Sequence, residues 1–161
     1  MLKLVLFLVA FVSFHASASI GIESPSGLGK AFLVYSEDPF EGKRTYKHVA
    51  IQSYVNVTCN TFSFRGLDGY FNEFSLPAVL KVRINDQDFE FSARYETVGV
   101  SQSRYYKVER SADFELFQKL VLAMKKGNSA LVGGKWRDDW ESKKIPLAGF
   151  TKAYNKLDCK S

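Results

Sequence analysis

The chain has 161 residues, of which 46% are hydrophobic and 15% aromatic, and its formal net charge is +5. This length fits one domain. The apolar content is sufficient for a hydrophobic core, and it excludes an intrinsically disordered chain. The sequence contains no internal repeat and no low-complexity tract.

The first 18 residues have the three parts of a secretory signal peptide. A lysine at position 3 precedes an apolar run over residues 4–14, and small residues follow at 16–18. The run is shorter than the about 20 residues of a transmembrane helix. We therefore predict a signal peptide over 1–18 and a single β-rich domain over 19–161, exported to the periplasm or secreted, with no stable membrane insertion after cleavage. Loss of Lys3 lowers the formal charge from +5 to +4.

The segment that follows alternates between turn-rich and strand-like stretches. Residues 19–30 are rich in Ser, Gly and Pro and predict a loop, and residues 30–36 predict a short strand. Residues 46–59 have a period of two, which indicates one half-buried strand. Its inward face would carry Val49, Ile51, Val55, Val57 and Cys59. Residues 61–66 predict another short strand.

The middle of the chain contains the clearest hairpin pattern. Alternating apolar and charged residues over 79–84 and 89–95 predict two strands, and the polar residues 85–88 predict the turn between them. Residues 104–110 predict a further strand.

The period then changes to that of a helix over 111–127, with Ser111 as the expected N-cap and Lys125, Lys126 and Gly127 at the end. Two strands, 129–136 and 143–148, are expected around a turn at 137–142, and a short final helix precedes Cys159. The buried sides of the two helices would carry Phe114, Phe117, Leu120, Val121, Met124, Phe150, Ala153, Tyr154 and Leu157. The expected fold is mainly β, a small β-sandwich or a curled antiparallel sheet with two C-terminal helices.

Cys59 and Cys159 are the only cysteines. Two cysteines in an oxidising compartment most often form a disulfide, the alternative being two separate buried thiols. A loop of about 100 residues would stabilise the fold by about 4–5 kcal/mol in the chain-entropy model. We therefore predict that the disulfide ties the final helix to the strand that carries Cys59.

Signatures of enzymatic chemistry are largely missing from the sequence. His48 is the only histidine of the mature chain, which excludes a site of several histidines, and no nucleophile motif accompanies it. The carboxylates at 85–88 and 137–139 fit turns better than calcium loops. We predict no catalytic residue, no metal and no cofactor. A carboxylate pair for glycoside hydrolysis stays open, because such pairs meet only in three dimensions.

Three segments, 43–48, 103–107 and 135–140, mix Lys or Arg with Tyr or Trp. Such surfaces bind anionic polymers or partner proteins, although alternating strands usually place charges outward and aromatic residues inward. Nucleic acid is not an expected partner of an exported protein. The candidate interaction surface comprises Trp136, Arg137, Trp140, Arg104 and Tyr105.

The segments "FELFQKLVLAMKKGNSALVGG" and "KKIPLAGFTKAYNKL" resemble the closing module of the invasion-associated locus B family. The resemblance covers about the last third of the chain, including Leu147, Gly149, Phe150 and Ala153. It implies an exported bacterial protein with a small β-sandwich fold and an envelope or host-surface role. A similar ending with a terminal cysteine occurs in periplasmic accessory proteins of type VI secretion. Members of the first family commonly carry additional cysteines, and no catalytic residue transfers from it.

These observations favour a non-enzymatic periplasmic or secreted protein that binds a protein, a cell-envelope component or a host surface. The alternatives are an inhibitor or immunity-type protein that acts on an envelope-targeted enzyme, and an accessory protein of a secretion system. A hydrolase that uses unrecognised carboxylates is a further class. The sequence leaves the oligomeric state open.

Overall fold

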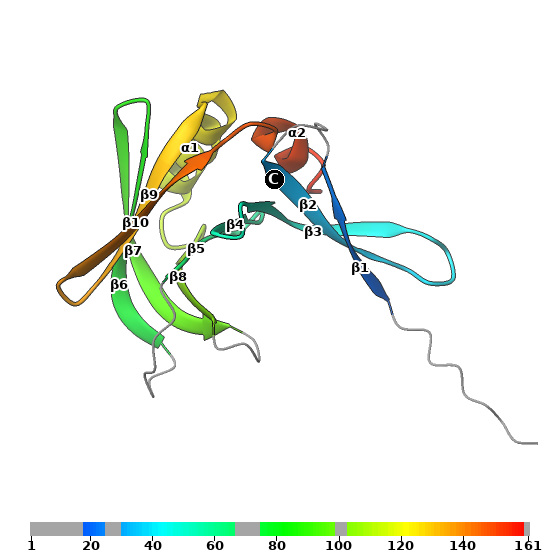
Figure 1. Cartoon of the computed structure of the whole chain (residues 1–161), viewed down its shortest axis with the longest axis horizontal. Coiled ribbons are helices and arrows are strands. Elements are labelled where there is room, and N and C mark those ends of the chain that lie inside the picture. Colours follow the sequence, from blue (N-terminus) through cyan, green and yellow to red (C-terminus); the bar gives the residue numbers. More distant parts are fainter. Residues whose placement is uncertain (1–17, 25–29, 67–74, 99–102, 160–161) are drawn as a thin grey trace, which may run out of the picture.

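A computed structural model describes residues 18–24, 30–66, 75–98 and 103–159 (Figure 1). Residues 1–17 of the predicted signal peptide lie outside this part. The described chain is mainly β, as predicted: ten strands form one antiparallel sheet accompanied by two short helices. The elements are β1 Ser19–Glu23, β2 Ala31–Glu37, β3 Arg44–Ile51, β4 Val55–Val57, β5 Thr61–Arg65, β6 Ser75–Ile84, β7 Gln87–Val98, β8 Ser103–Glu109, α1 Phe114–Lys126, β9 Ser129–Trp136, β10 Asp139–Pro146 and α2 Phe150–Tyr154.

The strands follow the order β1-β2-β3-β4-β5-β8-β7-β6-β9-β10 across the sheet. In Figure 1, β1, β2 and β3 extend to one side, and the strands from β5 to β10 curl on the other. Tyr106 of β8 packs against Gly134 of β9, although β7 and β6 separate these strands in the sheet. The described sheet is therefore strongly curled, but it does not close into a barrel.

The core lies where alternate residues of the strands meet the helices. Phe117, Leu120 and Met124 of α1 are buried, as are Phe150 and Ala153 of α2. The shorter helix α2 packs on β2 and β3, and α1 contacts α2 and β6. The predicted inner face of the 79–84 and 89–95 hairpin is confirmed, because its alternate apolar residues all belong to this core.

The strand predicted over residues 46–59 is wrong, because it is two strands joined by a tight turn. Gln52 and Ser53 adopt positive φ values of 50° and 63°, and the Tyr54 amide donates to the Ile51 carbonyl at 3.1 Å. The chain reverses between Ile51 and Val55, which face each other in the ladder. The alternation of buried residues continues across the turn, and this continuity concealed the reversal in the sequence.

The loop predicted over residues 19–30 begins with a strand. β1 pairs with β2 along its whole length, although Ile20 and Ile22 are 80% and 71% exposed. The Tyr35 ring covers Gly21, since a Cβ there would lie 2.3 Å from the ring. Strand β1 is stabilised by backbone pairing with β2 and by the Tyr35 ring. Its own apolar side chains are exposed, so an analysis of burial periodicity did not predict it.

The predicted disulfide is present and joins Cys59 to Cys159 across 100 residues, with a Cα–Cα distance of 5.2 Å. Cys59 lies between β4 and β5, in the turn after Val57, rather than inside the predicted strand. The disulfide therefore ties the segment after α2 to the middle of the sheet. It is compatible with an exported protein.

Candidate functional site

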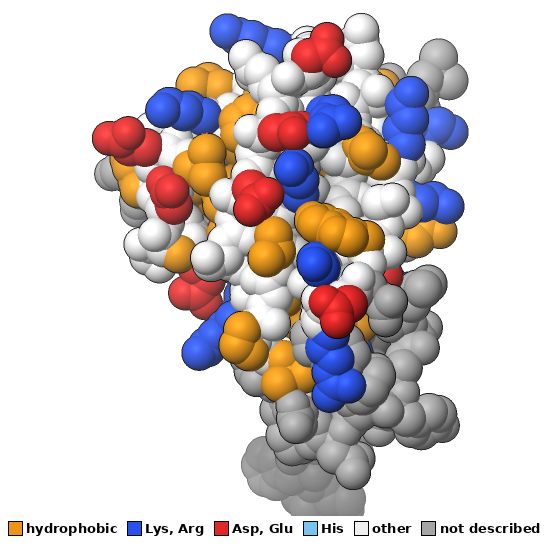
Figure 2. Space-filling model, turned by 90° about the vertical axis from the view of Figure 1, so that its left-hand side faces the viewer, with side chains coloured by type: hydrophobic (Ala, Val, Ile, Leu, Met, Phe, Trp, Pro, Cys, Tyr) orange, Lys and Arg blue, Asp and Glu red, His pale blue; other side chains and the backbone are white. Residues whose placement is uncertain are grey.

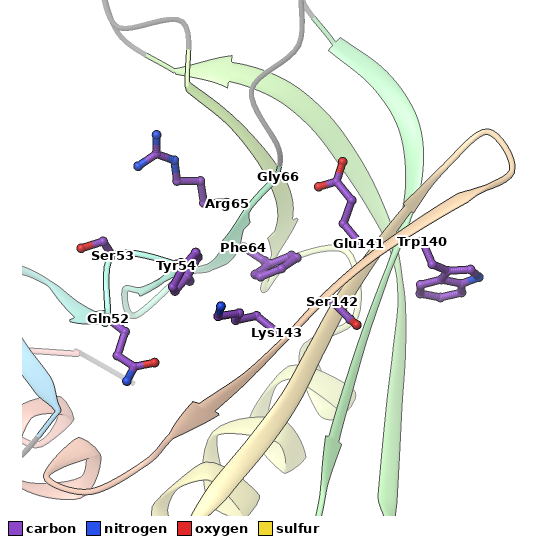
Figure 3. Close-up of a pocket in the computed structure, with 10 residues that line it drawn as sticks. All are labelled: Gln52, Ser53, Tyr54, Phe64, Arg65, Gly66, Trp140, Glu141, Ser142 and Lys143. Carbon is purple, nitrogen blue, oxygen red and sulfur yellow. The ribbon is translucent and has the colours of Figure 1, made fainter.

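An open cleft of about 780 Å³ lies where the curled sheet fails to close (Figure 3). One side is formed by residues 140–143 of β10, and the other by the turn at 52–54 and by residues 64–66 at the end of β5. These segments lie far apart in the sequence and come together only through the curl. The cleft is therefore a consequence of the tertiary structure.

Strand β10 lines the cleft with its backbone edge. It is the last strand of the described sheet and pairs only with β9. The hairpin turn at Arg137–Asp138 makes Trp136 and Asp139 the closing pair of the ladder. From that pair, antiparallel alternation directs the N–H and C=O groups of Trp140 and Ser142 away from β9. The edge that faces the cleft thus presents backbone donors and acceptors with no strand beside them in the described sheet.

The side chains in the cleft combine aromatic rings with a cation. The Lys143 ammonium lies 4.9 Å from the centre of the Tyr54 ring, across the cleft from β10. Tyr54 is 36% exposed, and Phe64 lies deeper and is buried. Figure 3 shows Lys143 directed toward Tyr54, while the Arg65 side chain points away. Lys143 lines the cleft, and within the described residues it forms no ion pair with a carboxylate.

Glu141 of β10 reaches toward the opposite side of the cleft. A Cβ on Gly66 would lie 2.9 Å from the Glu141 carboxylate oxygen and 2.9 Å from the Tyr95 hydroxyl. The absence of a side chain at Gly66 therefore lets Glu141 of β10 reach the end of β5. Glu141 and Lys143 of β10 thus both reach toward the opposite side of the cleft.

The prediction that Arg104 belongs to an interaction surface is wrong, because this residue is buried and only 4% exposed. Alternation along β8 places it on the buried face together with Tyr106 and Val108, and its guanidinium lies 5.7 Å from the centre of the Tyr95 ring. Tyr105 is half-buried on the opposite face, where it pairs with Arg65 of β5. The two neighbours therefore do not contribute to one surface.

Trp140 is 51% exposed, and Arg137 in the adjacent turn is exposed. The side chain of Trp136 lies outside the described residues. The Trp140 ring packs over Gly133 of β9, because its Cε3 atom would lie 3.5 Å from a Cβ there. Trp140 thus covers a glycine on the outer face of the sheet and lies at the rim of the cleft.

The outer face of the curled strands carries paired charges rather than one basic patch. Figure 2 shows hydrophobic side chains interspersed with positive and negative ones. Arg83 forms two hydrogen bonds with Asp88, at 2.6 and 2.9 Å, and Lys81 lies 3.4 Å from Glu90. Opposite charges facing each other across neighbouring strands stabilise the sheet modestly. Lys143 differs from these cations because it lines the cleft and has no such partner in the part of the chain that the structure describes.

A charged cluster connects β1 to the segment that follows α2. Glu23 of β1 accepts hydrogen bonds from Lys156, from the Tyr46 hydroxyl at 3.2 Å and from Arg44 at 3.4 Å. The hydrogen bond from Lys156, which follows α2, lowers the pKa of Glu23 most. These contacts tie the edge strand β1 to the C-terminal segment, so the cluster has a structural role.

His48 of β3 is half-buried, and burial lowers the pKa of its imidazole. No group of three His, Cys, Asp or Glu side chains with the arrangement of metal ligands occurs among the residues that the structure describes. The cleft lining contains one carboxylate, Glu141. Within the same described ranges, no helix is long and apolar enough to span a membrane.

Sequence reasoning did not identify Tyr54, Phe64 or Lys143 as site residues. Tyr54 was expected on the outer face of a continuous strand, and Lys143 resembles any other lysine at the start of a strand. Tyr54 reaches the cleft because it lies in the hairpin turn at 52–54, and Lys143 reaches it because β10 is an edge strand. The predicted tryptophan-containing segment at 135–140 lies in the β9–β10 hairpin, and Trp140 of this segment reaches the rim of the cleft.

The chain was compared with family models, curated proteins and solved structures, and none of them matches it.

Proposed function

We propose that this protein is an exported, non-enzymatic binding protein that holds a segment of a partner protein in the cleft between β10 and the turn at 52–54. The observation that carries the proposal is the combination of a free backbone edge, two aromatic rings and the Lys143 ammonium in one open cleft. Clefts that combine aromatic rings with a few directed polar groups are the usual form of binding sites.

Export is the second part of the proposal. It rests on the signal-like residues 1–18 and on the Cys59–Cys159 disulfide, which is typical of proteins outside the cytoplasm. The resemblance to the invasion-associated locus B family agrees with this location. In the structure Leu147, Phe150 and Ala153 are buried, and Gly149 adopts a φ of 84°. These four residues of the resemblance therefore serve the fold, and none of them lines the cleft.

The test is affinity capture from an extract of the exported fraction, with the mature protein as bait. Replacement of Lys143 by Glu reverses the charge in the cleft, and we expect it to abolish or strongly reduce capture of the partner. The captured protein is identified by mass spectrometry, purified, and its affinity for both baits measured by calorimetry.

Lys144→Glu is the matched control. Lys144 is the next residue of β10 and is exposed on the outer face, so the charge change is identical and only its position differs. The control variant should capture the same partner as the unchanged protein. Equal capture by the Lys143→Glu and Lys144→Glu baits would contradict the proposal.

An inhibitor of an envelope-targeted enzyme is the second candidate, and the same cleft would then receive a segment of that enzyme. The distinction lies in the partner's activity rather than in the site. If the captured partner is an enzyme, an activity assay with added protein decides between inhibition and simple binding.

A further inference from the structure

We infer that the occupant of the cleft is an extended polypeptide segment that adds a strand to the free edge of β10 and places an acidic side chain at Lys143. This inference rests on the proposed function and specifies the mode of binding and the chemistry of the partner.

The backbone of β10 is the first argument. Four consecutive residues, 140–143, line the cleft, although neighbouring side chains of a strand point to opposite faces. A run of consecutive lining residues means that the edge of the strand, and not one face, borders the cleft. The outward N–H and C=O groups of Trp140 and Ser142 are therefore in position to pair with an added strand.

The dimensions of the cleft agree with this mode. Residues 140–143 span about 10 Å at about 3.4 Å per residue, which offers at least one full repeat of antiparallel hydrogen bonding. The volume of about 780 Å³ leaves room for side chains on both sides of such a segment. The Tyr54 ring borders the space on the side opposite β10, so the added strand would lie against an aromatic surface.

Charge selects the partner residue. Lys143 is held over the Tyr54 ring and forms no ion pair within the described residues, whereas Arg83, Lys81 and Lys107 each have a carboxylate beside them. A carboxylate of the partner would supply a counter-charge for this exposed ammonium.

The other free edge of the described sheet, β1, does not offer these features. Its side chains Ile20 and Ile22 are exposed, and its only charged residue is Glu23, which is engaged by Lys156. A partner segment with an acidic side chain would therefore lie beside a lysine of β10, whereas β1 itself contains no Lys or Arg.

The experiment is selection of random linear peptides displayed on phage against the full mature protein. Enriched peptides should share an Asp or Glu flanked by residues that favour strands. Binding of the best synthetic peptide should fall roughly tenfold or more with Lys143→Glu, and replacement of its acidic residue by Lys should restore binding to that variant. The Lys144→Glu variant should bind like the unchanged protein.

Two changes test the backbone pairing. N-methylation of alternate peptide amides should abolish binding in one of the two alternation phases and not in the other, because only one phase faces β10. Ser142→Pro removes a cleft-facing N–H at an edge position that tolerates proline, and it should weaken binding while circular dichroism and the melting temperature stay near those of the unchanged protein.

The outcomes separate the two proposals. Absence of any enriched peptide, enrichment without acidic residues, or equal loss in both N-methylation phases overturns strand addition. If affinity capture still depends on Lys143 in that case, the proposed function stands with another mode of binding. If capture is also independent of Lys143, the proposed function fails as well.

Discussion

Individual glycines permit the curl that creates the cleft. Gly134 of β9 lies directly under the Tyr106 ring, so that a Cβ would come within 2.3 Å of the Cδ2 atom of this buried residue. Gly66 permits the approach of Glu141 in the same way. A glycine in a strand usually weakens it, but here it allows two strands that are not neighbours to come into contact.

The first prediction concerns Gly134→Ala. Because the Tyr106 ring is almost completely buried, we expect overpacking to lower the free energy of unfolding by about 1–3 kcal/mol. Gly133→Ala is the matched control, since this neighbour faces outward and its Cβ would meet no atom closer than 3.2 Å. Urea unfolding of both variants provides the measurement. A loss that is equal or larger for Gly133→Ala would mean that the contact with Tyr106 does not restrict the curl.

At the level of elements, the beginning of α1 differs from the prediction. The N-cap is Asp113, whose carboxylate accepts from the Leu116 amide at 2.9 Å, and not Ser111. Phe114, predicted on the buried stripe, is 49% exposed and lies under the Arg110 guanidinium at 4.3 Å. The helix therefore starts two residues later than its first candidate cap, and its buried stripe begins at Phe117.

The second prediction separates the two caps. Asp113→Ala removes an acceptor from the first turn of α1 and should lower the free energy of unfolding by about 1 kcal/mol. Ser111→Ala should leave stability almost unchanged, because Ser111 is exposed and precedes the cap. Thermal unfolding of both variants measures the difference, and a larger effect of Ser111→Ala would place the cap where the sequence pattern suggested.

At the level of the whole molecule, the disulfide joins the segment after α2 to the turn between β4 and β5. The neighbouring turn at 52–54 forms one side of the cleft, and the backbone connects the two through β4. Contacts between α2 and β2 and β3 support the same part of the sheet. The disulfide thus fixes the part of the sheet from which one side of the cleft is built.

The third prediction concerns loss of the disulfide. The double variant Cys59→Ser and Cys159→Ser should lose up to about 4.7 kcal/mol of stability, as the chain-entropy model gives for a loop of about 100 residues. Denaturant unfolding with and without a reducing agent measures the loss. The reducing agent should destabilise the unchanged protein and have no effect on the double variant. An unchanged midpoint for the reduced protein would show that tertiary packing alone holds the C-terminal segment.

The sequence by itself determined the local features of this protein. The alternation over 79–84 and 89–95, the stripe from Phe117 to Met124 and the pairing of Cys59 with Cys159 were all predicted, because each depends on periodicity within one segment or on a count of two cysteines. Prediction from the sequence failed where the alternation of apolar residues continued through a turn, and where a strand buries few of its side chains. The turn at Gln52 and Ser53 leaves the order of buried residues intact, and β1 buries little apolar surface.

Only the tertiary structure decided the candidate site. Lys143 came to face Tyr54 because the sheet curls, and the curl depends on contacts such as those of Tyr106 with Gly134 and of Glu141 with Gly66. These partners lie on strands that are distant in sequence and not adjacent in the sheet. A local pattern reports which face of a strand is apolar, but it carries no information about which distant strand that face will meet.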